Sequence, residues 1–129
     1  MGRVNGSHGV RVVPLEEVPP IQLPGGSWSR VILTGDRVGS ATALGFSNFA
    51  GGTATAMLSH STEELAYVLT GTGELRLEDE VVPYSAGSAL YIQAGVWHAV
   101  VNTGNEPVTM VFAFPHPDYP PTERRSDAQ

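Results

Sequence analysis

From Trp28 onward, short runs of apolar residues alternate with turn-forming residues. The clearest period-two pattern is GELRLED (73–79), where Leu75 and Leu77 alternate with charged residues, as in a strand with one buried face. The expected strand segments are WSRVILT (28–34), ATALGFSNFA (41–50), TATAMLSH (53–60), LAYVLTG (65–71), GELRLEDEVV (73–82), ALYIQAG (89–95), HAVVNTG (98–104) and PVTMVFAF (107–114). Short runs at near-regular spacing, without a helical period, predict an all-β sandwich or barrel.

Proline-rich segments flank this region on both sides. Residues 12–26 contain four prolines, which exclude a helix and indicate an extended arm or an edge strand. Residues 115–129 are rich in proline and then charged, which predicts an extended strap with a frayed tip. We therefore expect one domain, with an N-terminal arm at 1–26, a barrel at 27–116 and a C-terminal tail at 117–129.

Composition narrows the possible partners and chemistry. Seven basic and 13 acidic residues give a net charge of −6 without a basic cluster, which argues against nucleic-acid binding and anionic membranes. The absence of cysteine excludes disulfides, thiolate metal sites and cysteine nucleophiles, so any metal would be held by histidine and carboxylate. No apolar run has membrane-spanning length, and no signal-peptide pattern is present, so we expect a cytoplasmic protein.

Three residues are candidate metal ligands. His60 is expected to end one strand and Glu64 to begin the next, while His98 arrives from a third strand. Two histidines and one carboxylate can occupy one face of an octahedral metal and leave positions open, a ligand set suited to Fe(II) and also to Mn, Ni or Zn. The alternative is that each histidine is an ordinary surface or hydrogen-bonded core residue.

The stretch from Gly52 to Gly71 resembles the first sequence motif of the cupin family. That motif runs Gly, five residues, His-x-His, three or four residues, Glu, six residues, Gly. The corresponding residues are Gly52, Leu58-Ser59-His60, Glu64 and Gly71, and every spacing agrees. The resemblance implies a double-stranded β-helix, the jelly-roll barrel of the small single-domain cupins.

The stretch from Gly87 to Asn102 is similar to the second cupin motif, which runs Gly, five residues, Pro-x-Gly, two residues, His, three residues, Asn. The corresponding residues are Gly87, Gln93-Ala94-Gly95, His98 and Asn102. Both motifs occur in the correct order, and flanking strands extend the resemblance to most of the chain. The family hosts many activities, so the resemblance indicates the fold more specifically than the function.

Two residues depart from the motifs. Gln93 replaces a proline, which alters a turn, and Leu58 replaces the first metal-binding histidine. The full cupin set of three histidines and one glutamate is thereby reduced to His60, Glu64 and His98. Either the loss leaves a facial triad, which resembles the His-x3-Glu and distant histidine of some cupin oxygenases and epoxidases, or it marks a site that has lost its metal. Retention of the other ligands in register favours the triad.

Several residues are expected around the pocket of such a barrel. Leu58 shares a strand face with His60 and would form an apolar wall beside the metal, or fill the vacated space. The expected pocket residues are Leu58, Ala56, Tyr67, Tyr91, Trp97, Asn102 and Phe112. Tyr67, Tyr91 and Trp97 are also compatible with core packing or an interface, and Asn102 with fixing a turn. His116 is either a mobile acid-base group or a surface residue.

The resemblance leaves three functions open. The leading hypothesis is a metal-dependent enzyme acting on a small organic molecule, as an oxygenase or as an isomerase or lyase, with Fe(II) the most favoured metal and no catalytic residue assigned. The alternatives are a non-catalytic small-molecule binder with weak or no metal, and a metal-independent cyclase or isomerase. The partner is expected to be a small-molecule substrate, and the proline-rich arm suggests a homodimer in which it lies on a neighbour's sheet.

Overall fold

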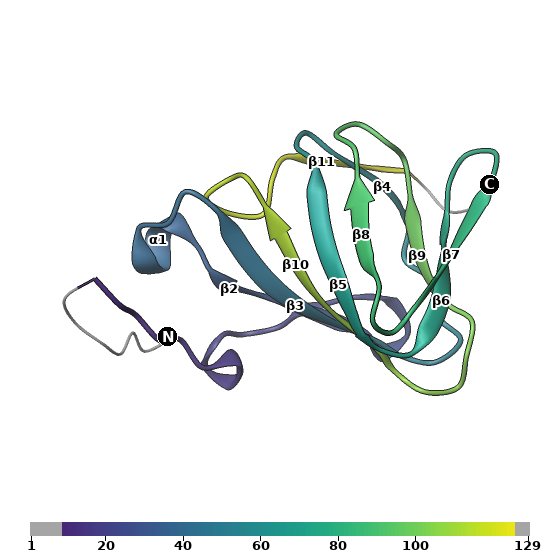
Figure 1. The fold of residues 1–129 in the computed structure, drawn as a ribbon, viewed down its shortest axis with the longest axis horizontal. Coiled ribbons are helices and arrows are strands. Elements are labelled where there is room, and N and C mark those ends of the chain that lie inside the picture. The colour runs from purple at the N-terminus through teal and green to yellow at the C-terminus, as the bar shows by residue number, and fades with distance from the viewer. Residues whose placement is uncertain (1–8, 126–129) are drawn as a thin grey trace.

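The computed structural model describes residues 9–125, which form mainly antiparallel strands (Figure 1). The strands are β1 Ile21–Gln22, β2 Trp28–Leu33, β3 Ala43–Phe49, β4 Met57–His60, β5 Glu64–Thr70, β6 Thr72–Arg76, β7 Val81–Ser85, β8 Ala89–Ile92, β9 Ala99–Asn102, β10 Val108–Phe114 and β11 Thr122–Arg125. Helical structure in this range is limited to the single turns η1 Leu15–Glu17, η2 Pro24–Gly26 and α1 Gly35–Val38. The predicted all-β class is confirmed.

The strands form the two walls of a barrel. One wall is a six-stranded sheet in the order β1-β2-β3-β10-β5-β8. The other contains β7-β6-β9 and the pair β11-β4, which isolated bridges join at Leu58–His98 and Ala54–Val101. Every pairing is antiparallel, so the chain has the jelly-roll arrangement expected from its motifs (Figure 1).

The core lies between the two walls and is built from alternating positions. β3 and β10 each bury every second residue along seven positions, which is the pattern of strands with one interior face. Phe112 and Phe114 of β10 are 5% and 1% exposed, and burying each contributes about 1.5–3 kcal/mol. Gly45 of β3 makes room for Phe112, because a Cβ at this position would overlap the phenylalanine ring.

The segment GELRLEDEVV (73–82) forms two strands where the sequence pattern predicted one. β6 ends at Arg76, a tight turn follows in which the Leu77 amide donates to the Glu80 carbonyl at 2.8 Å, and β7 begins at Val81. The acidic run 78–80 has no apolar partner to continue the alternation, and it faces solvent in the turn. β6 and β7 therefore form a hairpin at the edge of the second wall.

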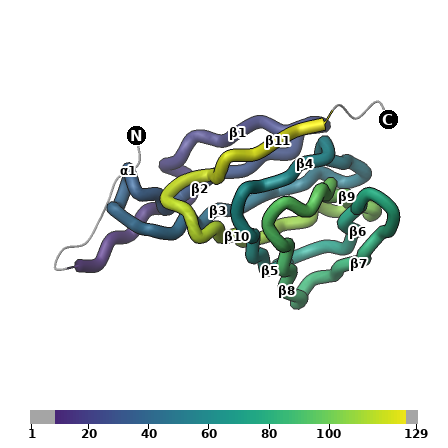
Figure 2. The backbone as a smooth tube through the Cα atoms, turned by 90° about the horizontal axis from the view of Figure 1, so that it is seen from above, coloured from purple at the N-terminus to yellow at the C-terminus, as the bar shows by residue number. Residues whose placement is uncertain are grey.

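Both flanking segments contribute strands to the barrel. Within the predicted arm, β1 pairs with this chain's own β2. Within the predicted tail, β11 pairs with β4, opposite Met57 to His60, and Figure 2 shows the C-terminal segment (yellow) crossing to reach it. Parts of both predictions, residues 1–8 of the arm and the frayed tip at 126–129, lie outside the described residues. Within residues 9–125, no helix is long and apolar enough to cross a membrane.

Candidate metal centre and cavity

The end of β4 and the start of β5 bring His60 and Glu64 together. β4 ends at His60, a three-residue turn reverses the chain, and β5 begins at Glu64, as the sequence pattern predicted. Both side chains point into the barrel, and His60 Nε2 lies 3.3 Å from Glu64 Oε1. The two walls thus each supply one of these groups, His60 from the β4 side and Glu64 from the six-stranded sheet.

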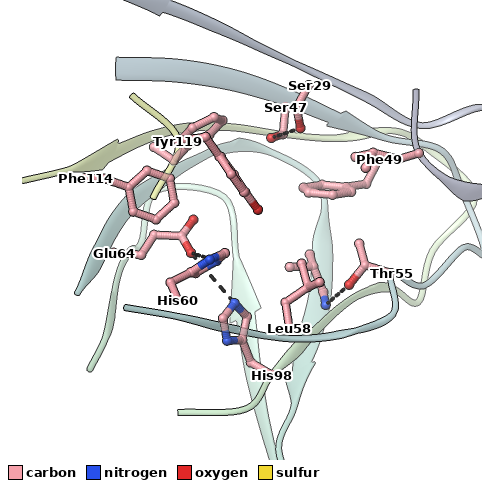
Figure 3. Close-up of a pocket in the computed structure, with 13 residues that line it drawn as sticks. Ser29, Ser47, Phe49, Thr55, Leu58, His60, Glu64, His98, Phe114 and Tyr119 are labelled. Carbon is pink, nitrogen blue, oxygen red and sulfur yellow. Dashed lines mark hydrogen bonds and ion pairs between the residues drawn. The ribbon is translucent and has the colours of Figure 1, made fainter. Parts of the chain in front are cut away.

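His98 joins them from the turn before β9. Two backbone hydrogen bonds with Leu58 hold it beside β4: the Leu58 amide donates to the His98 carbonyl at 2.8 Å, and the His98 amide donates back at 2.9 Å. His98 Nε2 lies 3.7 Å from Glu64 Oε1. Ligand atoms of the three residues lie within 4.8 Å of one another (Figure 3).

Hydrogen bonds on the far side of each ring decide which nitrogen faces the cavity. His98 Nδ1 lies 2.9 Å from the Val96 carbonyl, which only accepts, so this nitrogen carries the proton. His60 Nδ1 lies 2.7 Å from Thr122 Oγ1, whose own proton goes to the Pro120 carbonyl, so His60 Nδ1 is also the donor. In the neutral form of each imidazole, Nε2 is therefore the unprotonated nitrogen, and it faces Glu64.

The burial of this cluster reinforces that arrangement. His60 and His98 are 5% and 2% exposed. Burial lowers the pKa of His98 below its ordinary value of 6.5, and the adjacent His60 acts in the same direction, although the Val96 carbonyl and the Glu64 carboxylate oppose the shift. His98 is therefore neutral at neutral pH, which is the form that binds metals.

The donor set fits a divalent metal. Two imidazole lone pairs and a carboxylate oxygen repel one another at these separations unless a proton or a metal cation lies among them. Neutral imidazole and carboxylate are common ligands of Fe(II), Mn, Ni and Zn, and a hydrogen bond to the other ring nitrogen is the usual accompaniment of a metal-binding histidine. His60, Glu64 and His98 would hold such an ion.

The three residues lie in the wall of an internal cavity of about 70 Å³. Its lining is mainly apolar and contains Leu23, Ser29, Ser47, Phe49, Thr55, Leu58, His60, Glu64, His98, Val100, Phe112, Phe114 and Tyr119. Figure 3 shows Leu58 beside His98 at the cavity wall. Polar groups are therefore concentrated at a few points within an apolar enclosure, as in small-molecule sites.

The cupin domain family matches residues 45–114, more than half of the chain. This chain belongs to the cupin family. The cavity and the His60–Glu64–His98 cluster therefore lie inside a cupin barrel, and the fold that the two motifs implied is confirmed.

Two curated Streptomyces proteins are similar to this cupin. Protein SchB of Streptomyces halstedii is 32% identical over 114 residues, which cover 84% of this chain and 82% of SchB. The polyketide synthase CurC of Streptomyces cyaneus is 33% identical over 104 residues, which cover 79% of this chain and 67% of CurC.

Solved structures share the barrel at lower identity. The polyketide cyclase RemF of Streptomyces resistomycificus has a TM-score of 0.76 at 20% identity, and the match covers 92% of this cupin and 89% of RemF. An S161A mutant of the Bacillus subtilis oxalate decarboxylase OxdC has a TM-score of 0.75 at 21% identity, over 85% of this cupin and 30% of that chain. At these identities the likeness shows the fold alone.

Tyr119 is a cavity residue that the sequence pattern did not indicate. It lies in the C-terminal strap, packs edge-on against His60 and Phe114 with ring centroids 5.4 Å away in each case, and directs its hydroxyl into the cavity (Figure 3). Burial of the hydroxyl, and secondarily the charge of Glu64, raises the pKa of Tyr119 to about 12. An isolated aromatic residue among prolines was the only signal for it in the sequence.

Four of the expected pocket residues lie elsewhere than predicted. Tyr67 and Tyr91 are on the outer face of the six-stranded sheet, 47% and 63% exposed, because Ala66 and Val68 take the interior positions of β5. Trp97 lies outside the cavity lining, stacked on the Arg125 guanidinium at 4.0 Å. Asn102 is buried but fixes a turn, donating to the Phe49 and Glu106 carbonyls.

The position predicted for Ala56 in the cavity lining is taken by Thr55. β4 begins only at Met57, so the period-two alternation does not extend back through the irregular residues before it. The Thr55 hydroxyl accepts from the Val100 amide and donates to the Ala56 carbonyl. Leu58 and Phe112 do line the cavity, whereas His116 is absent from its lining and contacts Asp118 at the surface.

Proposed function

We propose that this cupin is a metal-dependent enzyme that acts on a small, oxygen-bearing organic molecule, most specifically a polyketide-type intermediate. The observation that carries the proposal is the convergence of His60 Nε2, His98 Nε2 and Glu64 Oε1 in the wall of an apolar cavity. Three protein ligands would leave coordination positions free for substrate, which is the requirement for catalysis at a metal.

Two relatives support the substrate class, and a third supports a divalent metal. CurC is named a polyketide synthase and RemF a polyketide cyclase, while the Bacillus subtilis oxalate decarboxylase has Mn(II) centres. Polyketide intermediates carry neighbouring carbonyl or enol oxygens on a largely apolar carbon skeleton, which suits one polar point in an apolar cavity. Oxygenation and an isomerase or lyase reaction, including ring closure, are the reaction types consistent with this set of ligands.

A bound divalent metal supplies Lewis acidity toward substrate oxygen atoms and, if it is Fe(II), activation of dioxygen. The chain's own residues supply the surroundings. Phe49, Phe112 and Phe114 exclude water and present flat apolar surfaces to a planar substrate. The Tyr119 hydroxyl stays protonated at neutral pH and can donate a hydrogen bond to a substrate oxygen near the metal-binding end.

The cavity is partly open to solvent, and Tyr119 stands in its wall. Tyr119 is the most exposed lining residue, at 38%, and lies in the loop between β10 and β11. We therefore infer that its ring moves aside when substrate enters. The other lining residues come mostly from paired strands, which are held by backbone hydrogen bonds.

The test is turnover of a simple polyketide mimic. Protein stripped with EDTA and then loaded separately with Fe(II), Mn(II), Ni(II) or Zn(II) is incubated with aromatic 1,3-dicarbonyl compounds such as 1-phenylbutane-1,3-dione and a phenyl triketone. Mass spectrometry detects loss of one water from ring closure of the triketone, or gain of oxygen by either compound. The expected result is conversion that needs metal and is lost in Glu64→Gln, which keeps the side-chain shape but removes its charge.

Conversion that persists in the stripped protein and in Glu64→Gln would contradict the metal-dependent proposal and favour metal-independent cyclisation. Binding of the mimics without any conversion by any metal form would instead favour a non-catalytic ligand-binding cupin. The mass-spectrometric measurement reads conversion, and calorimetric titration with the same mimics reads binding.

A further inference from the structure

Two serine hydroxyls meet in the cavity wall supplied by the six-stranded sheet. Ser29 of β2 and Ser47 of β3 are cross-strand partners, and their Oγ atoms lie 2.7 Å apart (Figure 3). Both line the cavity, and Ser47 is only 5% exposed. Period-two alternation places them on the interior face with apolar neighbours such as Val31 and Phe49, so a buried and a partly buried position of this face are polar.

The hydrogen bonds of this pair are incomplete. Each hydroxyl can donate one proton and accept at two lone pairs. Among the described residues, each has only the other as its side-chain hydrogen-bond partner. One of the two protons is therefore used within the pair, and the other is left for an acceptor in the cavity. In this partly buried pair, a ligand or water oxygen in the cavity can accept the remaining proton.

The pair lies across the cavity from the histidines. His60 and His98 belong to the wall formed by β4 and β9, whereas Ser29 and Ser47 belong to the opposite wall. Apolar side chains, including Phe49 and Leu58, line the space between them (Figure 3). The cavity therefore has polar groups on two facing walls and an apolar middle.

We propose that Ser29 and Ser47 form a second recognition point, which binds a neutral oxygen of the substrate distant from the reacting end. The proposal rests on the proposed function for the metal-binding end. It narrows the substrate class to an apolar, planar molecule with oxygen atoms at two separated places. One group of oxygen atoms faces His60, Glu64 and His98, and the other faces the two serines.

The chemistry of the pair favours a carbonyl or phenol over a carboxylate. The nearest basic residue in sequence, Arg30, is turned to the outer face, where its guanidinium stacks on Trp28 at 4.8 Å and donates to the Leu15 carbonyl. No lysine or arginine is among the residues that line the cavity within residues 9–125. A charged oxygen would thus be bound without a countercharge, which is unfavourable in an apolar enclosure.

The test compares ligands that differ by a single oxygen. In Zn(II)-loaded protein, 3,4-dihydroxyacetophenone offers two phenols to the metal end and a carbonyl to the far wall, whereas 4-isopropylcatechol has nearly the same shape without the carbonyl. Calorimetry should show the carbonyl compound binding about three- to tenfold more tightly to the wild type, the range expected for one hydrogen bond. The double variant Ser29→Ala/Ser47→Ala should bind both equally.

Two controls separate this proposal from the proposed function. Ser85→Ala, an exposed serine on β7, should keep the wild-type preference, and Zn(II) stoichiometry should be equal in all three proteins. If the wild type binds no Zn(II), the proposed function fails. Acetophenone and isopropylbenzene, measured on the metal-free protein, then test the serines alone. The proposal would be overturned if the wild type showed no preference for the carbonyl compound, or if the double variant kept that preference. It would also be overturned if neither ligand of a matched pair bound.

Discussion

At the scale of single residues, hydrogen bonds from the protein orient the metal-binding groups before any ion is bound. Thr122 accepts from His60 Nδ1, and the Val96 carbonyl accepts from His98 Nδ1. Each bond fixes both the ring orientation and the tautomer, so that Nε2 faces Glu64 with its lone pair free. Thr122 comes from β11, so the C-terminal segment supports the site although it supplies no ligand.

Thr122→Val should therefore weaken metal binding. Losing the acceptor for His60 Nδ1 frees the ring to rotate and to change tautomer, so the dissociation constant for Zn(II) or Mn(II) should rise about 10–100-fold. Isothermal titration calorimetry on EDTA-stripped protein measures this dissociation constant. Thr122→Ser retains the hydroxyl and should stay close to the wild type; an unchanged constant in Thr122→Val would show that this hydrogen bond does not orient the ligand.

Leu58 offers a second test at the residue scale. It lines the cavity next to His98, at the position where the resemblance to the first cupin motif expects a histidine. Leu58→His should supply a fourth ligand and tighten metal binding about tenfold or more, equal to about 1.4 kcal/mol. Competition against a metal-sensitive dye measures the change, with Leu58→Ile as the apolar control. Equal affinities in the two variants would mean that residue 58 does not face the ion.

At the scale of elements, the sequence predicted strands well where one face is buried. Apolar runs of strand length marked β3, β5 and β10 in the sequence, and burial alternates along each of them. The run in β5 is apolar on both faces, so the sequence did not show that Ala66 and Val68, rather than Tyr67, lie inside.

β11 was missed because TERR has no apolar face, and its pairing with β4 rests on backbone hydrogen bonds. Arg125 of β11 also forms an ion pair with Glu78 in the turn between β6 and β7. Tyr119, Thr122 and Leu23 reach the site from these flanking segments, and no local pattern marks them.

The hairpin of β6 and β7 is tied to β9 by a buried tyrosine. The Tyr84 hydroxyl donates to the Val101 carbonyl at 2.9 Å, and its ring packs where Gly73 leaves space. Burial, with a smaller effect of the Glu74 charge, raises the pKa of Tyr84 from 10.0 to about 12. Because the folded-state pKa is above the unfolded one, the associated stability is complete below pH 10 and is lost as pH rises through about 12.

Tyr84→Phe should lower the unfolding free energy at pH 8 by roughly 1–2 kcal/mol, since the Val101 carbonyl loses its side-chain donor. The variant should also lose less stability than the wild type between pH 10 and 12. Urea unfolding at several pH values measures both effects. Tyr91→Phe, at an exposed tyrosine, should behave as the wild type. Parallel pH curves for Tyr84→Phe and the wild type would contradict the assignment.

At the scale of the whole molecule, one face of the barrel is free of charge. Strands β3, β10, β5 and β8 adjoin one another and contain a single charged residue, Glu64, which points inward. The outer face of the sheet exposes Leu65, Tyr67, Leu69 and Tyr91 by 45–63%. With a net charge of −6, two copies repel one another elsewhere, so this uncharged face is where we propose that a second copy packs.

The predicted homodimer with the N-terminal arm laid on a neighbour's sheet stays a prediction, and within this chain β1 pairs with β2. Light scattering coupled to gel filtration should give the mass of a dimer for the wild type and of a monomer for Leu65→Lys/Tyr67→Lys, since two buried lysines in each copy would face apolar partners. Val82→Lys, on the exposed surface of the other wall, should remain dimeric. A monomeric wild type, or a dimeric double variant with unchanged circular dichroism, would contradict packing through the uncharged face.

The central claim is that His60, Glu64 and His98 bind one divalent metal ion. The most direct test is metal content by mass spectrometry on untagged protein purified without chelator, before and after anaerobic incubation with Fe(II). The account predicts about one ion per chain in the wild type and none in His98→Ala, with the fold kept, because His98 borders a cavity. A wild type that stays metal-free after loading, or a His98→Ala variant with full occupancy, would contradict it.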